Sequence, residues 1–309
     1  MPEIFPIGGG KGGVGKSFIA VNIGALIARH GYRVVLVDLD LGASNLHTFL
    51  GIKRPKGGIN SYLIKSVNGL EQVAAPTPFP NLFFISSVHC SMEIANLYHA
   101  QKVKLINAIK ALPYDYILLD LGAGTNFNTL DFFLTSDQGV FVCTPEPTSI
   151  ENAFRFIKAA YLRRLKQIIH LNSFQKIIKQ AILESDRRQL GSADIIDMVL
   201  KYDPDRESFL RESIRRFQFS FIINQFRKNT DATLGKKLEM VCNRHFYSRF
   251  KFLGNVNYDE RVSESILKRT LFSLQYPDTA ASSALRWIAK EMRRNIPDME
   301  KKQEFHEDI

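Results

Sequence analysis

Residues 10–17 read Gly-Lys-Gly-Gly-Val-Gly-Lys-Ser, a glycine-rich loop of the form G-x-x-x-x-G-K-[ST]. It follows an apolar run from Glu3 to Ile7 that predicts a strand, and it precedes an apolar run that predicts a helix. Glycines let the backbone of such a loop wrap with its N–H groups turned inward, which forms a concave site for anionic oxygens. The sequence therefore predicts a phosphate-binding loop between a strand and a helix.

The side chains of this loop indicate what it binds. We expect the Lys16 ammonium to lie on the β- and γ-phosphates of a nucleotide and the Ser17 hydroxyl to ligate Mg²⁺. The other residues expected at the nucleotide are its neighbours along the chain: Gly10, Lys11, Gly12, Gly13, Val14, Gly15 and Phe18.

Beyond the loop, short β-branched runs alternate with longer helical ones, as in a strand and crossover-helix fold. The predicted strands are Glu3 to Ile7, Arg33 to Asp38, Leu82 to Ser86, Tyr114 to Asp120, Gly139 to Thr144, Phe219 to Asn224 and Phe250 to Val256. Near-continuous apolar runs among them suit a parallel sheet that is buried on both faces. We predict an α/β domain with a doubly wound, mostly parallel sheet.

One segment interrupts the alternation. From about residue 155 to 217 the chain has helical spacing of apolar residues and no strand pattern. The predicted organisation is a domain that carries the phosphate-binding loop, formed by residues 1–154 and 218–296, a helical insertion at 155–217, and a flexible acidic tail at 297–309.

Composition and charge restrict the class of protein. The 309 residues are 45% hydrophobic and 23% charged, and the three cysteines are far apart, which predicts a folded cytoplasmic protein with reduced thiols. The net charge is +10, and residues 155–217 hold 14 basic against 8 acidic residues. The outer face of that segment, including Arg163 and Arg164, is the expected surface for an anionic partner such as nucleic acid.

Acidic residues follow two of the predicted strands. Asp38 and Asp40 close the second strand, and Asp120 ends the apolar strand at residues 116–119. Open α/β sheets place ligands at the carboxyl ends of their strands, so these carboxylates are expected to face the Mg²⁺ and the γ-phosphate. Asp120 fits the position of an acid that holds Mg²⁺ through water.

The second lysine of the loop narrows the family. With Lys11, the loop resembles the deviant Walker A loop of the MinD/ParA family of dimerising ATPases. The resemblance implies ATP as the nucleotide and a Lys11 that reaches across a two-fold interface to the phosphates of the other subunit. It also implies that Asp40 orients the attacking water, that Asp38 is a partner of the metal, and that Asn45 lies near the facing subunit's nucleotide.

Further resemblances extend along residues 3–154 and 218–295. The stretch Thr-Pro-Glu-Pro-Thr-Ser at residues 144–149 is similar to the flagellar-number regulators called FlhG or FleN. Gly124 belongs to a segment that resembles the family's second switch, in which Gly122 replaces a usual proline. By the same resemblance Asn224 reads the adenine, and Asn257 stands at the adenine-side loop where relatives have proline.

The resulting interpretation is a Mg²⁺-dependent ATP hydrolase whose nucleotide state switches a homodimer and so controls a protein partner. Two alternatives stay open: a DNA-binding partition ATPase that uses the basic second half, and a metallocluster or metal-insertion carrier, which the spacing of Cys90, Cys143 and Cys242 disfavours. A purely structural nucleotide-binding module is a third. The acidic tail disfavours anchoring to anionic lipid, while the helix before it is compatible with peripheral membrane contact.

Overall fold

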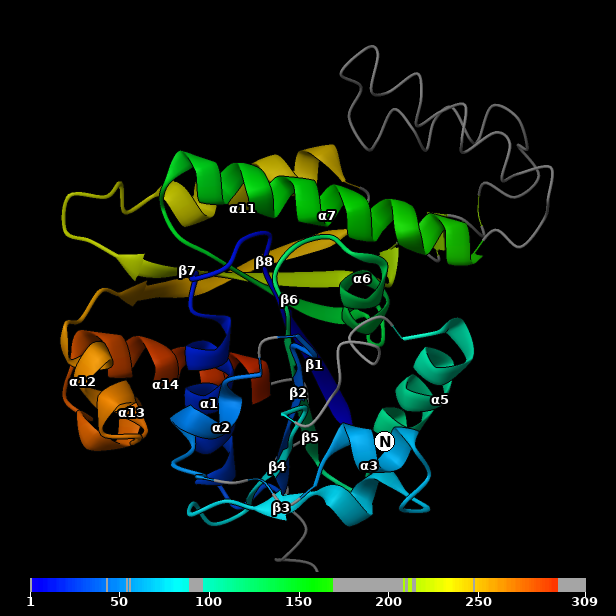
Figure 1. Ribbon diagram of the computed structural model, residues 1–309. Helices are drawn as coiled ribbons and strands as arrows, with labels where there is room; N and C mark the ends of the chain where they lie inside the picture. The colour runs from blue at the N-terminus through cyan, green and yellow to red at the C-terminus, as the bar shows by residue number, and fades with distance from the viewer. Residues whose placement is uncertain are drawn as a thin grey trace, which may run out of the picture.

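A single eight-stranded sheet forms the centre of the molecule (Figure 1). The computed structural model describes residues 2–42, 44–53, 55, 57–88, 97–168, 208, 211–212, 215–246 and 248–293. The strands are β1 (Glu3–Gly8), β2 (Val34–Leu39), β3 (Ala75–Pro76), β4 (Leu82–Ile85), β5 (Tyr116–Leu121), β6 (Gln138–Cys143), β7 (Gln218–Phe226) and β8 (Arg249–Asn257). Their order is β3-β4-β2-β5-β1-β6-β7-β8, and every pairing is parallel except that of β3 with β4. The predicted doubly wound α/β sheet is confirmed, and the edge strand β3 is an addition to it.

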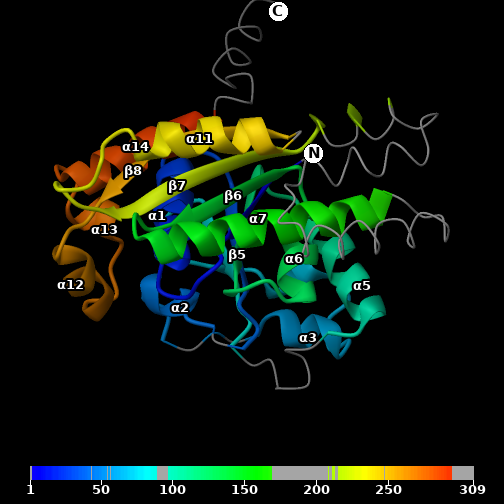
Figure 2. The same cartoon turned by 90° about the horizontal axis from the view of Figure 1, so that it is seen from above.

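Helices cover both faces of this sheet, as the two views show (Figures 1 and 2). One face is covered mainly by α1 (Lys16–Ala28) and α14 (Ala280–Arg293), and the other by α5 (His99–Lys110), α6 (Phe127–Phe133), α7 (Pro147–Ile168) and α11 (Leu234–His245). The shorter helices are α2 (Leu46–Phe49), α3 (Ile59–Leu63), the 3₁₀ turn η1 (Leu70–Val73), α12 (Arg261–Leu267) and α13 (Phe272–Gln275).

The alternation of side chains along β2 explains why its whole apolar run is buried. Val34 and Leu36 pack in the core on the α1 side, whereas Val35 and Val37 pack in the core on the α5 side. Successive strand residues point to opposite faces, so a strand that is covered on both faces needs apolar residues at every position. This arrangement leaves the carboxyl ends of the strands as the place where polar residues gather.

Helix α7 crosses the boundary that the sequence pattern placed at residue 155. It begins at Pro147 and continues to Ile168, and Phe156, Ala160 and Tyr161 are buried in the main core. The helical spacing in this part of the sequence therefore reports a helix of the core layer. The rest of the expected insertion lies almost entirely outside the described residues, as does the expected tail at 297–309.

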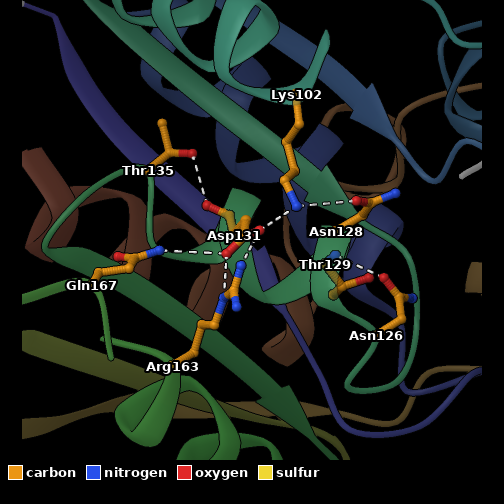
Figure 3. Close-up of polar contacts among 8 residues, drawn as sticks. All are labelled: Lys102, Asn126, Asn128, Thr129, Asp131, Thr135, Arg163 and Gln167. Carbon is orange, nitrogen blue, oxygen red and sulfur yellow. Dashed lines mark hydrogen bonds and ion pairs between the residues drawn. The ribbon is translucent and has the colours of Figure 1, made fainter. Parts of the chain in front are cut away.

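Helices α5, α6 and α7 are tied together by a buried carboxylate (Figure 3). Asp131 of α6 accepts two hydrogen bonds from the Arg163 guanidinium of α7, at 2.7 and 2.9 Å, and pairs with the Lys102 ammonium of α5. Gln167 also donates to it, at 3.4 Å. Asp131 is 5% exposed, so this carboxylate is buried and is neutralised by the buried Lys102 and the partly exposed Arg163.

This packing corrects one expectation about the basic face. Arg163 binds Asp131, and Arg164 pairs with Asp137 at 3.1 Å while its guanidinium stacks over the ring of Phe217. Both arginines thus hold the helical layer together instead of presenting a free cationic surface. The charge count alone did not reveal these long-range partners. Within the described residues, no helix is both long enough and apolar enough to cross a membrane.

Candidate nucleotide site

A cleft of about 520 Å³ opens at the carboxyl ends of the central strands. Eleven of the residues that the sequence nominated line it: Gly12, Gly13, Gly15, Lys16, Ser17, Phe18, Asp40, Asn45, Asp120, Asn224 and Asn257. They come from the loop after β1, the first turn of α1, the segment between β2 and α2, and the carboxyl ends of β5, β7 and β8. Five nominated residues do not line the cleft, namely Gly10, Lys11, Val14, Asp38 and Gly124.

The glycines of the loop are required by its geometry. Gly13 and Gly15 have φ angles of 78° and 92°, in the left-handed region that side chains disfavour. At Gly10 a Cβ would lie 2.1 Å from the carbonyl oxygen of Asn152, because the loop runs directly against α7. Helix α1 then begins at Lys16, so the loop ends at a helix N-terminus whose free N–H groups favour anions.

The two lysines of the loop have different environments. Lys16 is only 8% exposed and lines the cleft, where burial lowers its pKa against the attraction of Asp120 and Asp40. Lys11 is exposed and lies outside the cleft lining. A buried cation beside the phosphate loop is positioned to bind phosphate within its own subunit, whereas an exposed cation at the rim is available to another molecule.

Asp38 organises the loop that follows β2. Its carboxylate accepts hydrogen bonds from the Asp40 N–H at 3.1 Å, the Ser44 hydroxyl at 2.6 Å and the Leu46 N–H at 3.4 Å. Burial raises the pKa of Asp38 to about 6 despite these bonds. Both oxygens are thus committed to fixing the turn that carries Asp40 and Asn45, and its expected contact with a metal remains a prediction.

Asp120 lies opposite Asp38 on the neighbouring strand and has fewer partners. It is 2% exposed, it accepts a hydrogen bond from Ser17, and its Oδ1 is buried with no hydrogen-bond partner among the described residues. Burial, reinforced by the negative charge of Asp38, raises the pKa of Asp120 to about 8. The positive charge of Lys16 opposes this rise without cancelling it, so a further cation beside the free oxygen would stabilise the carboxylate.

A magnesium ion fits this donor set. Mg²⁺ is usually held by one or two carboxylates, substrate phosphates and water, and not by a cage of protein groups alone. Among the residues that the structure describes, no three His, Cys, Asp or Glu side chains form a metal cluster. Ser17 and Asp120 at the edge of the phosphate cleft therefore suit a cation that arrives with a nucleotide, and not one bound by protein ligands only.

Asp40 and the second glycine-rich loop meet at the cleft. A Cβ on Gly122 would lie 3.2 Å from Asp40 Oδ1, so the glycine leaves the Asp40 carboxylate room beside the end of β5. The same glycine stands where the resemblance expects proline, and the structure gives its small size a role. The Gly124 backbone turns with a φ of 86°, but only Ala123 of this loop reaches the cleft lining.

Amides and an aromatic ring from the ends of β7 and β8 line the cleft beside the phosphate loop. The Asn224 side chain donates through Nδ2 to the Val14 carbonyl at 2.9 Å, which leaves its Oδ1 as an acceptor. Tyr258 lines the cleft after Asn257, and the Arg227 guanidinium lies 3.9 Å from the centre of its ring. The cleft thus combines a phosphate loop with an amide acceptor and an aromatic ring, the kinds of group that suit the phosphates and the base of a nucleotide.

Several lining residues were not nominated from the sequence: Phe49, Ala123, Gln225, Tyr258, Asp259, Glu260, Val262, Ser263 and Ile266. Most follow β8 or form α12, which starts at Arg261. These residues could have been predicted from the sequence because they closely follow the nominated Asn257 along the chain. Gln225 adjoins Asn224, but the alternation of a regular strand would direct it to the opposite face.

Comparison with known proteins agrees with this geometry. The profile of a family described as "CobQ/CobB/MinD/ParA nucleotide binding domain" matches residues 6–272. The flagellum site-determining protein YlxH of Helicobacter pylori is 32% identical over 247 residues, which cover 72% of this chain and 80% of that protein. A putative septum site-determining protein MinD of Nephroselmis olivacea is 33% identical over 154 residues, covering 50% of this chain and 56% of the relative.

The chain thus matches only about half the length of such MinD relatives. Among solved structures, the septum site-determining protein MinD of Pyrococcus horikoshii, complexed with Mg-ADP, superposes with a TM-score of 0.65 over 96% of this chain and 97% of that one, at 19% identity. That likeness shows the same fold. The profile match spans both the phosphate loop and the strands that complete the cleft, and this chain belongs to the CobQ/CobB/MinD/ParA family of nucleotide-binding domains.

Proposed function

We propose that this protein is a Mg²⁺-dependent ATPase that dimerises with ATP bound and thereby controls where or when a partner protein acts. The observation that carries the proposal is the contrast between its two loop lysines. Lys16 is buried in the cleft, whereas Lys11 is exposed beside it. A site with an internal and an external lysine is suited to being completed by a second subunit.

Each residue at the cleft has a task in this proposal. Lys16 neutralises the β- and γ-phosphates, and Asp40 orients the water that attacks the γ-phosphate. Ser17 and Asp120 would hold Mg²⁺, which supplies positive charge to the transferring phosphoryl group. Lys11 brings a further charge from the opposite subunit, so hydrolysis depends on assembly because charge stabilisation is the main requirement of this reaction.

The names of the relatives support a role in site determination. YlxH is a flagellum site-determining protein, and MinD is a septum site-determining protein. We infer that this chain acts in the same general way, in the cytoplasm and on an unidentified protein partner. The Asn224 Oδ1 acceptor favours adenine, whose exocyclic amino group donates a hydrogen bond, over guanine, which presents a carbonyl oxygen there.

The alternatives have less support. A metallocluster carrier needs accessible thiolates, but Cys143 and Cys242 are buried and burial raises the pKa of each thiol to about 12. Cys90 lies outside the described residues. A DNA-binding partition ATPase needs free cations, and two of the arginines expected to supply them are paired with Asp131 and Asp137.

Sedimentation velocity tests the proposal. The variant Asp40→Ala, which should bind ATP without hydrolysing it, is compared in ADP and in ATP with Mg²⁺. We expect a dimer only with ATP, because a ligand that binds the dimer better must promote dimerisation. Adding Lys11→Ala should abolish the dimer while nucleotide binding persists, whereas Lys110→Ala, an exposed lysine on α5, should leave it unchanged. An Asp40→Ala protein that stays monomeric in saturating ATP would contradict the proposal.

A further inference from the structure

The end of β7 contains an irregularity that changes where its side chains point. Ile223 pairs with Asn255 of β8, and Phe226 pairs with Asn257. Two residues of β7, Asn224 and Gln225, therefore stand opposite the single residue Val256. This is the pattern of a β-bulge, which bends a strand and redirects a side chain.

The backbone at the bulge is strained. Gln225 has a φ of 56°, in the left-handed region that non-glycine residues rarely adopt. Such a conformation persists only when surrounding contacts hold it, and it is enriched at functional sites. Here the surrounding strand is held on both sides of the bulge, and the Tyr258 N–H also donates to the Phe226 carbonyl at 2.9 Å.

The consequence is that two adjacent amides reach one loop. Asn224 Nδ2 donates to the Val14 carbonyl at 2.9 Å, and Gln225 Nε2 donates to the Gly13 carbonyl at 3.1 Å. In a regular strand these neighbouring side chains would lie on opposite faces of the sheet. The left-handed residue and the bulge place both of them on the phosphate-binding loop.

Holding these carbonyls fixes the N–H groups on the far side of the same peptides. A peptide unit is planar and trans, so its C=O and N–H point in opposite directions. The Gly13 carbonyl shares its peptide with the Val14 N–H, and the Val14 carbonyl shares its peptide with the Gly15 N–H. Gln225 thus constrains one donor of the phosphate-binding loop, and Asn224 constrains the next.

We propose that Gln225 is a positioning residue for the nucleotide phosphates: it is delivered by the bulge in β7 and keeps the peptide between Gly13 and Val14 in its binding orientation. This inference rests on the proposed binding of ATP at the cleft and adds to it a residue that does not need to touch the ligand. The left-handed strain at Gln225 is then retained because its amide organises the loop before nucleotide arrives.

The experiment separates the amide from the backbone strain. Gln225→Ala and Gln225→Gly both remove the donor, but only glycine relieves the left-handed conformation. We expect both variants to bind ATP and ADP about three- to tenfold more weakly by calorimetry, as the loss of one neutral hydrogen bond predicts. Gln225→Gly should nevertheless melt at a higher temperature than Gln225→Ala.

Asn81 supplies the matched control, because it also has a left-handed φ, of 63°, at an exposed turn before β4. Asn81→Gly and Asn81→Ala should differ in melting temperature in the same direction and leave nucleotide affinity unchanged. Wild-type affinity in both Gln225 variants would overturn the inference, and so would recovery of affinity in Gln225→Gly alone. A folded wild-type chain that binds no ATP would overturn the proposed function itself and this inference with it.

Discussion

Asp120 and Asp131 are two buried aspartates on consecutive elements, β5 and α6, with opposite environments. Asp131 is buried with Arg163 and Lys102, and hydrogen bonds from these two cations leave its pKa below the usual value although burial opposes this. Asp120 is more deeply buried, has one oxygen without a partner, and has a pKa raised to about 8. The comparison separates a carboxylate that serves the fold from one that is available to a ligand.

The physical reason is the cost of burying charge. A buried carboxylate is tolerated when cations and hydrogen-bond donors surround it, and otherwise it takes up a proton. Asp131 meets the first condition through α5 and α7 (Figure 3). Asp120 meets it only in part, through the nearby charge of Lys16, and a cation that enters the cleft would complete it, which is the role we propose for Mg²⁺.

The largest expected effect is a loss of folding stability when Asp131 is replaced. Asp131→Ala leaves the buried Lys102 and the partly exposed Arg163 without their partner and should lower the free energy of unfolding by about 3 kcal/mol. Denaturant titration measures it. A triple variant with Asp131→Leu, Lys102→Met and Arg163→Met removes every charge and should recover most of that stability. A single variant as stable as the wild type would show that the cluster does not hold the helices together.

The next effect compares two buried lysines, Lys16 in the cleft and Lys102 in the cluster. Lys16→Met should weaken ATP binding by a hundredfold or more, equivalent to about 2.7 kcal/mol, because it removes the charge on the phosphates. Lys102→Met should mainly lower the melting temperature and leave ATP affinity near the wild-type value. Calorimetry and thermal unfolding of both variants check this. Unchanged ATP affinity in Lys16→Met would remove the cleft from nucleotide binding.

A third effect is the pH dependence of the folding stability of the nucleotide-free protein. The folded-state pKa of Asp120 is raised to about 8, so between pH 4 and 8 the folded state holds a proton that the unfolded state has lost. Its contribution to stability is therefore present at low pH and is lost as pH rises, by up to about 1.4 kcal/mol per pH unit. Asp120→Asn should flatten the curve between pH 6 and 8. A wild-type stability that rises with pH between pH 6 and 8 would contradict a raised pKa at Asp120.

The smallest effect concerns the partly exposed pair of Arg164 with Asp137. Its side chains are 28% and 43% exposed, so solvent screens the charges. Arg164→Ala should cost below about 1 kcal/mol of stability, part of it through lost stacking on Phe217. Urea titration of this variant beside Asp131→Ala gives the contrast directly. A loss equal to that of Asp131→Ala would mean that burial does not separate the two pairs.

Much of the fold was predictable because its signals are local. The phosphate loop has fixed residue types at fixed spacing, and the apolar runs at Val34 and Tyr116 give buried strands regardless of context. The acids Asp38, Asp40 and Asp120 were found because strand ends converge at one edge of a parallel sheet. These features can be predicted from the residues on either side of them in the sequence.

The remaining features depend on contacts between distant segments. From the sequence we expected Arg163 on an outer face, because its partner Asp131 is 32 residues away and no local pattern identifies the pair. Gln225 was missed because its direction depends on a bulge relative to β8. Helix α7 continues through the predicted boundary at residue 155, because a helix of the core layer and a helix of an insertion have the same spacing of apolar residues.

Calorimetric titration of ATP with Mg²⁺ and with EDTA, in the wild type and in Asp120→Asn, tests the central claim most directly. We expect Mg²⁺ to tighten ATP binding to the wild type by about tenfold or more, since it places a cation beside the unpaired Asp120 oxygen. Asp120→Asn should fold and bind ATP, with most of the Mg²⁺ dependence lost, while Arg164→Ala keeps the wild-type response. If Mg²⁺ strengthens ATP binding equally in Asp120→Asn and the wild type, Asp120 does not bind Mg²⁺ and the account is contradicted.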